Sequence, residues 1–236
     1  MKIAVVGTGY VGLVTGTCFA ETGNTVTCVD IDTNKIKKLS SGQITIYEPG
    51  LEKLFLRNQK DSRLRFTTSL SEGIKDAQVI CLALPTPPGE DGSADLKYIL
   101  GVADDLGKIL TDYKVIIDKS TVPVGTAAKV KDAIAANYKG EFDVVSNPEF
   151  LREGNAVDDF MQPDRVVIGV GSKKAETIMR QLYQPLSVQN VPLVITSSAS
   201  AEMIKYTANC YLAMRIGFVN QVSDVCEAVG ADIGEV

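Results

Sequence analysis

The sequence contains no histidine. This absence excludes Ser-His and Cys-His nucleophile pairs, histidine metal sites and every acid-base scheme that uses an imidazole. Any chemistry must therefore depend on Lys, Asp, Glu, Cys, Thr, Tyr or Asn side chains, and we expect no metal site.

Cysteine is scarce and widely spaced. The chain has five, with no C-x-x-C pair: Cys18, Cys28, Cys81, Cys210 and Cys226. An odd number at these spacings fits neither a disulfide framework nor a zinc knuckle, which favours a reducing cytoplasmic location. We interpret all five as small buried hydrophobic residues, because none has a glycine-rich neighbourhood.

An excess of positive charge and long apolar runs are also missing. Lys and Arg number 24 and Asp and Glu 29, and without a basic tract we expect no nucleic-acid partner. No stretch reaches the ~18 uninterrupted apolar residues of a membrane helix. The apolar start of the chain is broken by glycines and has no cleavage-site pattern, so we do not expect a signal peptide or a membrane partner.

What is present is the pattern of an α/β protein. The chain has 236 residues, and at ~150 residues per domain this length suggests one domain and part of another. Short β-branched runs alternate with helical patterns, which predicts parallel strands joined by helical crossovers. The runs are 3–6, 25–30, 78–84, 115–118, 143–146, 166–170 and 193–196. We predict a doubly wound Rossmann-type parallel sheet over residues 1–196.

After this sheet the pattern becomes helical without interruption. It runs from Ser198 to about Val229, with Ser198 or Ser200 able to cap it and Gly230 able to end it. At ~1.5 Å per residue this helix would be about 45 Å long, more than one domain usually needs. We expect residues 197–236 to be the truncated start of a further region, and the chain to lack its second half.

A G-x-G-x-x-G pattern follows the first strand and opens a helix expected to reach Thr22. Gly7 allows a tight turn, Gly9 the close approach of a pyrophosphate, and Gly12 close packing of the helix on the strand. The free N–H groups at the start of this helix would face the phosphates. The pattern therefore predicts a dinucleotide site.

The end of the second strand indicates which dinucleotide. A carboxylate there, Asp30, accepts hydrogen bonds from a ribose 2′-OH and repels a 2′-phosphate, which favours NAD over NADP. We expect Lys35 to reach the same ribose. The alternative is that Asp30 caps the helix that begins near Asp32.

Ligands in such sheets bind beyond the carboxyl ends of the strands. The segments that follow three of the predicted strands, 85–88, 119–126 and 147–154, are polar or kinked by proline. We expect a nicotinamide and a substrate to meet there. The alternative is that the prolines only end strand pairing and that Thr86 and Thr121 are turn or cap hydroxyls.

Six motifs, in order along the whole chain, resemble the UDP-glucose/GDP-mannose dehydrogenase family. They are GTGYVGL (7–13), YEPGL (47–51), KSTVPVGT (119–126), NPEFLREG (147–154), PDR (163–165) and EMIKY (202–206). The segment 149–165 resembles the UDP-glucose branch best. Sister enzymes that use GDP-mannose or UDP-N-acetylhexosamines share the motifs and stay open as alternatives.

The resemblance implies NAD-dependent oxidation of the C6 alcohol of UDP-glucose to UDP-glucuronate, with two NAD molecules reduced in turn. It also implies a homodimer formed through the long helix, so that residues 197–236 would begin a central dimerisation region. The implied NAD-binding positions are Gly7, Gly9, Tyr10, Val11, Gly12, Asp30, Lys35, Thr86, Thr121 and Glu153. The implied sugar-binding positions are Glu149, Phe150, Leu151, Arg152, Glu153, Lys205 and Asn209.

The resemblance further implies catalytic roles for four of these residues. Glu149 would help to activate water in a final thioester hydrolysis, Lys205 and Asn209 would stabilise oxyanions, and Thr121 would act beside them. Lys205 and Asn209 are four apart on the predicted helix and share a face, and an ammonium with an amide donor suits a developing oxyanion. The alternative is an ordinary solvated helix face.

One part of the family pattern has no match. The family carries a cysteine nucleophile in a glycine-rich segment beyond the long helix, and none of the five cysteines lies in such a segment. We therefore expect the chain alone to bind NAD without completing the reaction. Two other readings remain: a β-hydroxyacid dehydrogenase, which also carries Lys-x-x-x-Asn on a long helix, and a noncatalytic NAD-binding module.

Overall fold

The computed structural model describes residues 1–188 and 190–236. Within them one sheet has the strand order β3-β2-β1-β4-β5-β6-β7-β8. The strands are β1 (Lys2–Val6), β2 (Thr25–Val29), β3 (Leu64–Thr67), β4 (Val79–Leu82), β5 (Val115–Asp118), β6 (Asp143–Ser146), β7 (Val166–Gly169) and β8 (Leu193–Thr196). The α/β fold expected from the alternating pattern is confirmed.

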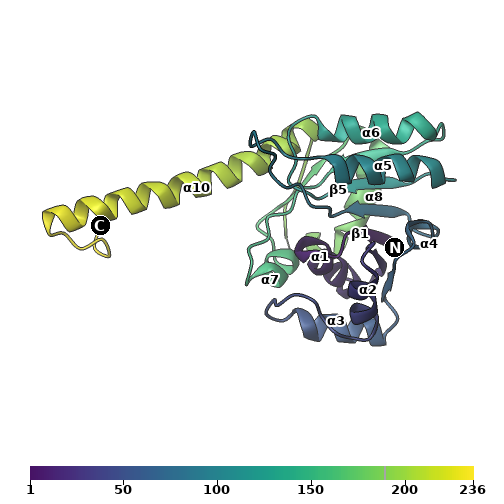
Figure 1. Cartoon of the computed structure of the whole chain (residues 1–236), viewed down its shortest axis with the longest axis horizontal. Helices are drawn as coiled ribbons and strands as arrows, with labels where there is room; N and C mark the ends of the chain where they lie inside the picture. The colour runs from purple at the N-terminus through teal and green to yellow at the C-terminus, as the bar shows by residue number, and fades with distance from the viewer. Residues whose placement is uncertain (189) are drawn as a thin grey trace.

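Helices cover both faces of this sheet (Figure 1). They are α1 (Tyr10–Glu21), α2 (Thr33–Ser40), α3 (Leu51–Lys60), α4 (Leu70–Ile74), α5 (Lys97–Ile109), α6 (Thr126–Asn137), α7 (Ala156–Met161), α8 (Lys173–Leu182), α9 (Gln184–Ser187) and α10 (Ser198–Val229). Successive residues of β1 alternate between two buried clusters, with Ile3 and Val5 on one face and Ala4 and Val6 on the other. The first cluster packs against α1, α3, α7 and α8, and the second against α5 and α6. Burial on both faces explains the continuous apolar character of the central strands.

The expectation that every strand pair is parallel is wrong at β6 and β7. These strands pair antiparallel through one residue pair, Ser146 with Gly169, which are the last residues of both strands. The segment 147–165 forms a loop and α7, and it does not carry the chain back to begin a parallel strand beside β6. As a result the carboxyl ends of β6 and β7 meet, and α10 starts beside them.

Strand β3 was not expected from the sequence. It is a four-residue strand at the edge of the sheet, and its sequence includes the charged Arg65 between Leu64 and Phe66. Pairing with β2 selects this segment as a strand, in a register that places Val26 opposite Leu64. A short edge strand with a solvent-facing charge gives a weak sequence signal.

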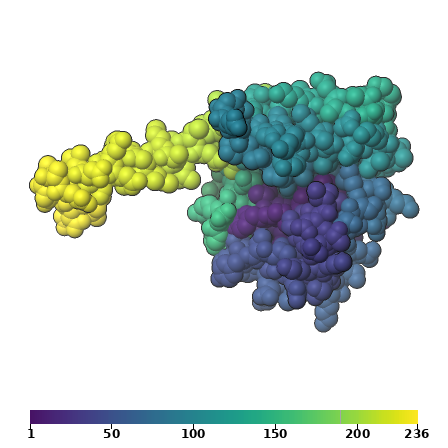
Figure 2. Space-filling model, viewed as in Figure 1, coloured from purple at the N-terminus to yellow at the C-terminus, as the bar shows by residue number. Residues whose placement is uncertain are grey.

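Helix α10 confirms the long helix, although its cap is Ser197, whose side chain accepts a hydrogen bond from the Ser200 amide. Its end at Gly230, with φ of 77°, agrees with expectation. The helix is anchored by its first turns, where Gly169 leaves room for Ser198 and Ala201 to approach β7. The rest stands clear of the sheet (Figures 1 and 2).

Because of this geometry the distal part of α10 is exposed. Cys210 is exposed, so interpreting it as a buried hydrophobic residue was wrong, whereas Cys18, Cys28, Cys81 and Cys226 are buried as expected. Apolar side chains on the same part of the helix are each more than half exposed: Leu212, Ile216, Phe218, Val219 and Val225. In the described part of the chain, no helix is both long enough and apolar enough to span a membrane.

Candidate dinucleotide and substrate site

The glycine loop between β1 and α1 has the geometry that a pyrophosphate requires. Gly7 has φ of +97°, which favours glycine, and a Cβ on Gly12 would collide with the carbonyl oxygen of Gly7. A Cβ on Gly9 would meet no atom within 4 Å, so the backbone there is open to a ligand. The first N–H groups of α1 have no side-chain cap, which leaves them available to phosphate oxygens.

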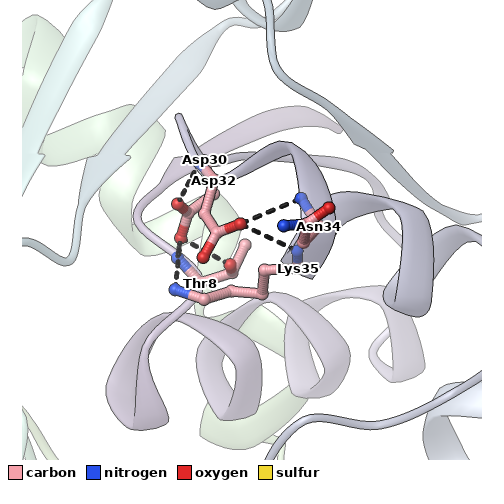
Figure 3. A network of polar contacts seen from close by, with 5 residues as sticks. All are labelled: Thr8, Asp30, Asp32, Asn34 and Lys35. Carbon is pink, nitrogen blue, oxygen red and sulfur yellow. Dashed lines mark hydrogen bonds and ion pairs between the residues drawn. The ribbon is translucent and has the colours of Figure 1, made fainter.

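Asp30 is held at the end of β2 by a network of donors (Figure 3). Its Oδ2 accepts hydrogen bonds from the Thr8 amide at 2.9 Å, the Thr8 hydroxyl at 2.6 Å and Lys35 Nζ at 3.0 Å. Burial raises the pKa of Asp30, but these hydrogen bonds and one from the Asp32 amide outweigh burial, so the pKa lies below its usual value. The carboxylate is therefore charged and fixed beside the glycine loop.

The alternative role for Asp30, as a helix cap, does not hold. The side chain of Asp32 caps α2 by accepting hydrogen bonds from the amides of Asn34 and Lys35, at 2.9 and 3.0 Å. Asp30 instead accepts from the Asp32 amide with Oδ1. Its Oδ1 has one hydrogen bond and so keeps capacity for a further donor such as a ribose hydroxyl.

The loops after β4 and β5 interlock at the same edge of the sheet. Thr86 donates a hydrogen bond from Oγ1 to the carbonyl of Thr121 at 2.9 Å, and the Ser120 hydroxyl donates to the carbonyl of Leu84 at 2.9 Å. Both threonines are half-buried. Because Ala83 also abuts Gly7, the loops that follow β1, β4 and β5 form one continuous surface.

A buried ion pair lies at the end of β6. Glu149 Oε1 is 2.9 Å from Lys205 Nζ, and the two side chains are 12% and 7% exposed. Glu149 Oε2 accepts a hydrogen bond from the Leu151 amide at 2.6 Å, and Lys205 Nζ lies 5.3 Å from the centre of the Phe150 ring. Two residues predicted from separate motifs are thereby brought together. A buried carboxylate beside a buried ammonium suits both proton transfer and oxyanion stabilisation.

Other predicted residues occupy more exposed positions. Asn209 lies one turn beyond Lys205 on α10 but is exposed, so the two do not share the same buried setting. Arg152 is exposed and pairs with Asp159 at 2.6 Å, and Glu153 is exposed. Leu151 is half-buried, and Phe150 is covered by the guanidinium of Arg165, 4.0 Å from its ring centre.

Sequence reasoning missed the residue that anchors the part of α10 that carries Lys205. Glu202, one turn earlier on α10, is buried and accepts hydrogen bonds from the amides of Gly125 and Ala127, at 2.6 and 2.8 Å, and from Ser146 at 3.3 Å. It thus ties α10 to the start of α6 and the end of β6. The signal was available, because a glutamate three residues before Lys205 lies on the same helix face.

Two further buried titratable residues were given no role from the sequence. Asp118 ends β5 and accepts from the Ser120 amide, but its Oδ2 has no hydrogen-bond partner among the described residues, and burial raises its pKa to about 7. Its neighbour Lys119 is buried against Asn147 Oδ1 at 3.2 Å and the Tyr183 hydroxyl at 3.4 Å, and burial lowers its pKa. Asp118 lines a small cavity together with Glu202 and Lys205.

None of the cysteines is placed to serve this edge as a nucleophile. Burial raises the pKa of Cys81 to about 12, and it also raises the pKa values of Cys18 and Cys28 above their usual value. Cys226 is buried near the far end of α10, and Cys210 is exposed on that helix. A thiolate reaction would need a sulfur from elsewhere.

Comparisons with known proteins match this geometry. Residues 1–187 match the NAD binding domain of the UDP-glucose/GDP-mannose dehydrogenase family, and residues 199–236 match its central domain. UDP-glucose 6-dehydrogenase TuaD of Bacillus subtilis is 51% identical over an alignment of 237 positions, which covers 100% of this chain and 51% of that protein. The chain therefore spans about half the length of the curated relatives it matches.

Two solved structures have the same fold over nearly the whole chain. A UDP-glucose dehydrogenase from Pyrobaculum islandicum has a TM-score of 0.94 and 37% identity, covering 98% of this chain and 54% of that one. A GDP-mannose dehydrogenase from Pseudomonas aeruginosa has a TM-score of 0.92 and 32% identity, covering 100% of this chain and 55% of that one. With the glycine loop, Asp30 and the family-model matches over both regions, these findings establish that the chain belongs to the UDP-glucose/GDP-mannose dehydrogenase family.

Proposed function

We propose that the chain binds NAD on the glycine loop and supplies side chains that act on C6 of UDP-glucose, which is oxidised to UDP-glucuronate. The observation that carries this proposal is the buried Glu149–Lys205 pair at the sheet edge where the loops after β1, β4 and β5 interlock. When bound, NAD accepts the hydride from C6. Similarity to UDP-glucose 6-dehydrogenases over the full chain supports the choice of sugar.

The cofactor choice follows from Asp30. Its carboxylate, charged and fixed beside Thr8 and Lys35, would accept a ribose hydroxyl with Oδ1 and repel a 2′-phosphate. We propose that Gly7, Gly9, Tyr10, Val11 and Gly12 hold the pyrophosphate, and that Lys35, Thr86, Thr121 and Glu153 complete the site. The open space around Gly9 and the uncapped start of α1 fit this ligand.

Lys205 would donate a hydrogen bond to the sugar oxygen that develops negative charge, because an ammonium in a water-poor setting stabilises an oxyanion strongly. Glu149, 2.9 Å away, would orient that ammonium and later take a proton from the water that hydrolyses a thioester. Asn209 would add an amide donor, Thr121 would lie beside them, and Phe150, Leu151 and Arg152 would line the sugar. The thiol for the second oxidation would come from outside these 236 residues.

We propose that α10 pairs with a second copy of the chain. The exposed apolar residues Leu212, Ile216 and Val219 are spaced i, i+4 and i+7 and so lie on one face of α10. This face supports the pairing, since contiguous exposed apolar surface marks a protein contact. Sedimentation equilibrium is expected to give a dimer. A monomer that persists at high concentration would contradict pairing through α10.

The proposed cofactor is tested by titration calorimetry with NAD and NADP. NAD is expected to bind more tightly than NADP, and Asp30→Ala to weaken NAD about 10- to 100-fold, the effect of losing hydrogen bonds to a charged group. Asp105→Ala, which removes an exposed carboxylate from α5, is the matched control. Equal affinity of the wild type for the two cofactors, or wild-type NAD affinity in Asp30→Ala, would overturn the proposal.

The sugar is tested by measuring binding of UDP-glucose and GDP-mannose to the NAD-loaded chain. The similarity to a GDP-mannose dehydrogenase makes GDP-mannose the second candidate. UDP-glucose is expected to bind preferentially. Preference for GDP-mannose would move the chain to the sister activity.

A further inference from the structure

Three segments that are far apart in the sequence meet at the buried carboxylate of Glu48. Glu48 is 6% exposed and lies in the loop before α3. Its Oε2 accepts hydrogen bonds from the Tyr10 hydroxyl and from the Gly154 amide, the latter at 2.9 Å, and its Oε1 accepts from the Ala156 amide at 2.7 Å. One side chain thus joins the start of α1 to the loop that leads into α7.

The junction is maintained because Glu48 stays ionised and therefore accepts all three hydrogen bonds. Burial raises its pKa, but the hydrogen bonds from Tyr10, Gly154 and Ala156 outweigh burial, so the pKa lies below its usual value. Burial and the neighbouring carboxylate raise the pKa of Tyr10, which keeps its hydroxyl a donor. No Lys or Arg forms an ion pair with Glu48 within the described segments, so these neutral donors alone hold the charge.

The junction at Glu48 connects the glycine loop with the loop that begins at Glu149. Tyr10 directly follows Gly9, whose backbone is open to a pyrophosphate. Gly154, with φ of +87°, directly follows Glu153 in the loop that begins at Glu149. That loop reaches Lys205 through Glu149. Movement at the glycine loop is therefore linked through one carboxylate to the loop that holds the buried ion pair.

We propose that Glu48 is a positioning residue that couples dinucleotide binding to the order of the substrate loop, residues 149–156. A dinucleotide that fixes Tyr10 fixes the acceptor on which the Gly154 and Ala156 amides depend, and fewer open states of the loop remain. By linkage, a sugar nucleotide that orders the loop tightens the dinucleotide by the same factor. This proposal rests on the proposed function in one respect, because it takes the dinucleotide to be NAD.

Amide hydrogen exchange in the 236-residue chain, followed by NMR with and without saturating NAD, tests the coupling. In the wild type, NAD is expected to slow exchange at Gly154 and Ala156 by at least about fivefold, the lower end of typical coupling energies. In Tyr10→Phe, which removes the hydroxyl and keeps the ring, the slowing at saturating NAD is expected to fall below about twofold. Calorimetry on each protein sets the NAD concentration that saturates it.

A matched control isolates the Glu48 link from a general loss of a tyrosine hydroxyl. Tyr113 donates to Asp143 at 2.6 Å, the same kind of bond, between the segment before β5 and the start of β6. Tyr113→Phe is expected to leave the slowing at Gly154 and Ala156 at the wild-type value. Glu48→Gln, a second route to the same link, is expected to lose the slowing as Tyr10→Phe does.

The outcomes separate the coupling from the cofactor assignment. If NAD binds the wild type and the slowing persists in Tyr10→Phe, the coupling is wrong while the cofactor proposal stands. If NAD does not bind the wild type, both are overturned. If NAD binds and the slowing disappears only in Tyr10→Phe and Glu48→Gln, the coupling is established.

Discussion

The glycine loop and the Glu149–Lys205 pair lie at one edge of the sheet, but different interactions hold them in place. The glycine loop is shaped by backbone sterics, since Gly7 and Gly12 stand where a side chain would collide. The Glu149–Lys205 pair depends on contacts between distant segments, with Glu202 holding α10 to α6 and β6. Local sterics specify the first half of the site, and tertiary packing specifies the second.

The largest effect is expected at Lys205. Lys205→Ala, introduced into a polypeptide that carries this chain and has the proposed oxidation activity, should lower kcat about 10²- to 10³-fold, the usual cost of losing one oxyanion donor, with a much smaller change in NAD affinity. Steady-state kinetics and calorimetry measure the two effects. Lys173→Ala, which removes an exposed lysine of α8, is the control. Wild-type turnover in Lys205→Ala would sink the assignment.

Substitutions in the glycine loop should change the stability of the chain and its NAD affinity, whereas Lys205→Ala changes mainly kcat. Gly12→Ala is expected to destabilise the chain by about 1–3 kcal/mol, as overpacking does, and to abolish NAD binding. Gly9→Ala meets no atom within 4 Å, so it should fold normally and still weaken NAD binding. Urea unfolding and calorimetry of both variants decide. Equal stability losses in the two variants would break the argument from sterics.

Asp118 gives an effect that appears only as a function of pH. Its pKa, about 7 in the folded chain against about 3.9 unfolded, means that the native state keeps a proton that the unfolded chain has released. Its contribution to stability is full below pH ~4 and is lost as pH rises towards ~7, at up to about 1.4 kcal/mol per pH unit. Glu202 and Lys205 line the same cavity.

The check is urea unfolding of the wild type and Asp118→Asn from pH 5 to 8. The difference in unfolding free energy between the two should shift in favour of the variant as pH rises. Asp105→Asn, at an exposed position, should show no such trend. A pH-independent difference for Asp118→Asn would mean that Asp118 is charged throughout this range.

The smallest effect is expected at Lys35, which pairs with Asp30 beside the glycine loop. Lys35→Met removes one of three donors to Asp30 Oδ2, while both hydrogen bonds from Thr8 remain. Because the ion pair is partly exposed, we expect NAD affinity to fall by less than about tenfold. Titration calorimetry measures this change. A loss as large as that of Asp30→Ala would show that Lys35 contacts the cofactor more strongly than it supports Asp30.

The contrast between the two halves also explains what the sequence could predict. Local patterns of spacing and periodicity predict the glycine loop, the position of Asp30 at the end of β2, and α10, and the structure has all three. Glu48 and Glu202 accept hydrogen bonds from partners 38 to 108 residues away, and Asp118 acts through burial. The spacing of Glu202 and Lys205 predicts that they share a helix face, but it does not predict these distant partners. Strand β3 and the antiparallel β6–β7 pair were missed for the same reason, since strand pairing selects them.

The most direct test of whether the two halves form one site is an NMR titration of the chain with NAD. Backbone signals of Gly9, Tyr10 and Asp30 are expected to shift together with those of Thr121 and Leu151, at one common dissociation constant. This result would show that dinucleotide binding at the glycine loop extends, by contact or through Glu48, to the loop that holds Glu149. Shifts confined to Gly9, Tyr10 and Asp30, with Thr121 and Leu151 unchanged at saturation, would contradict the account.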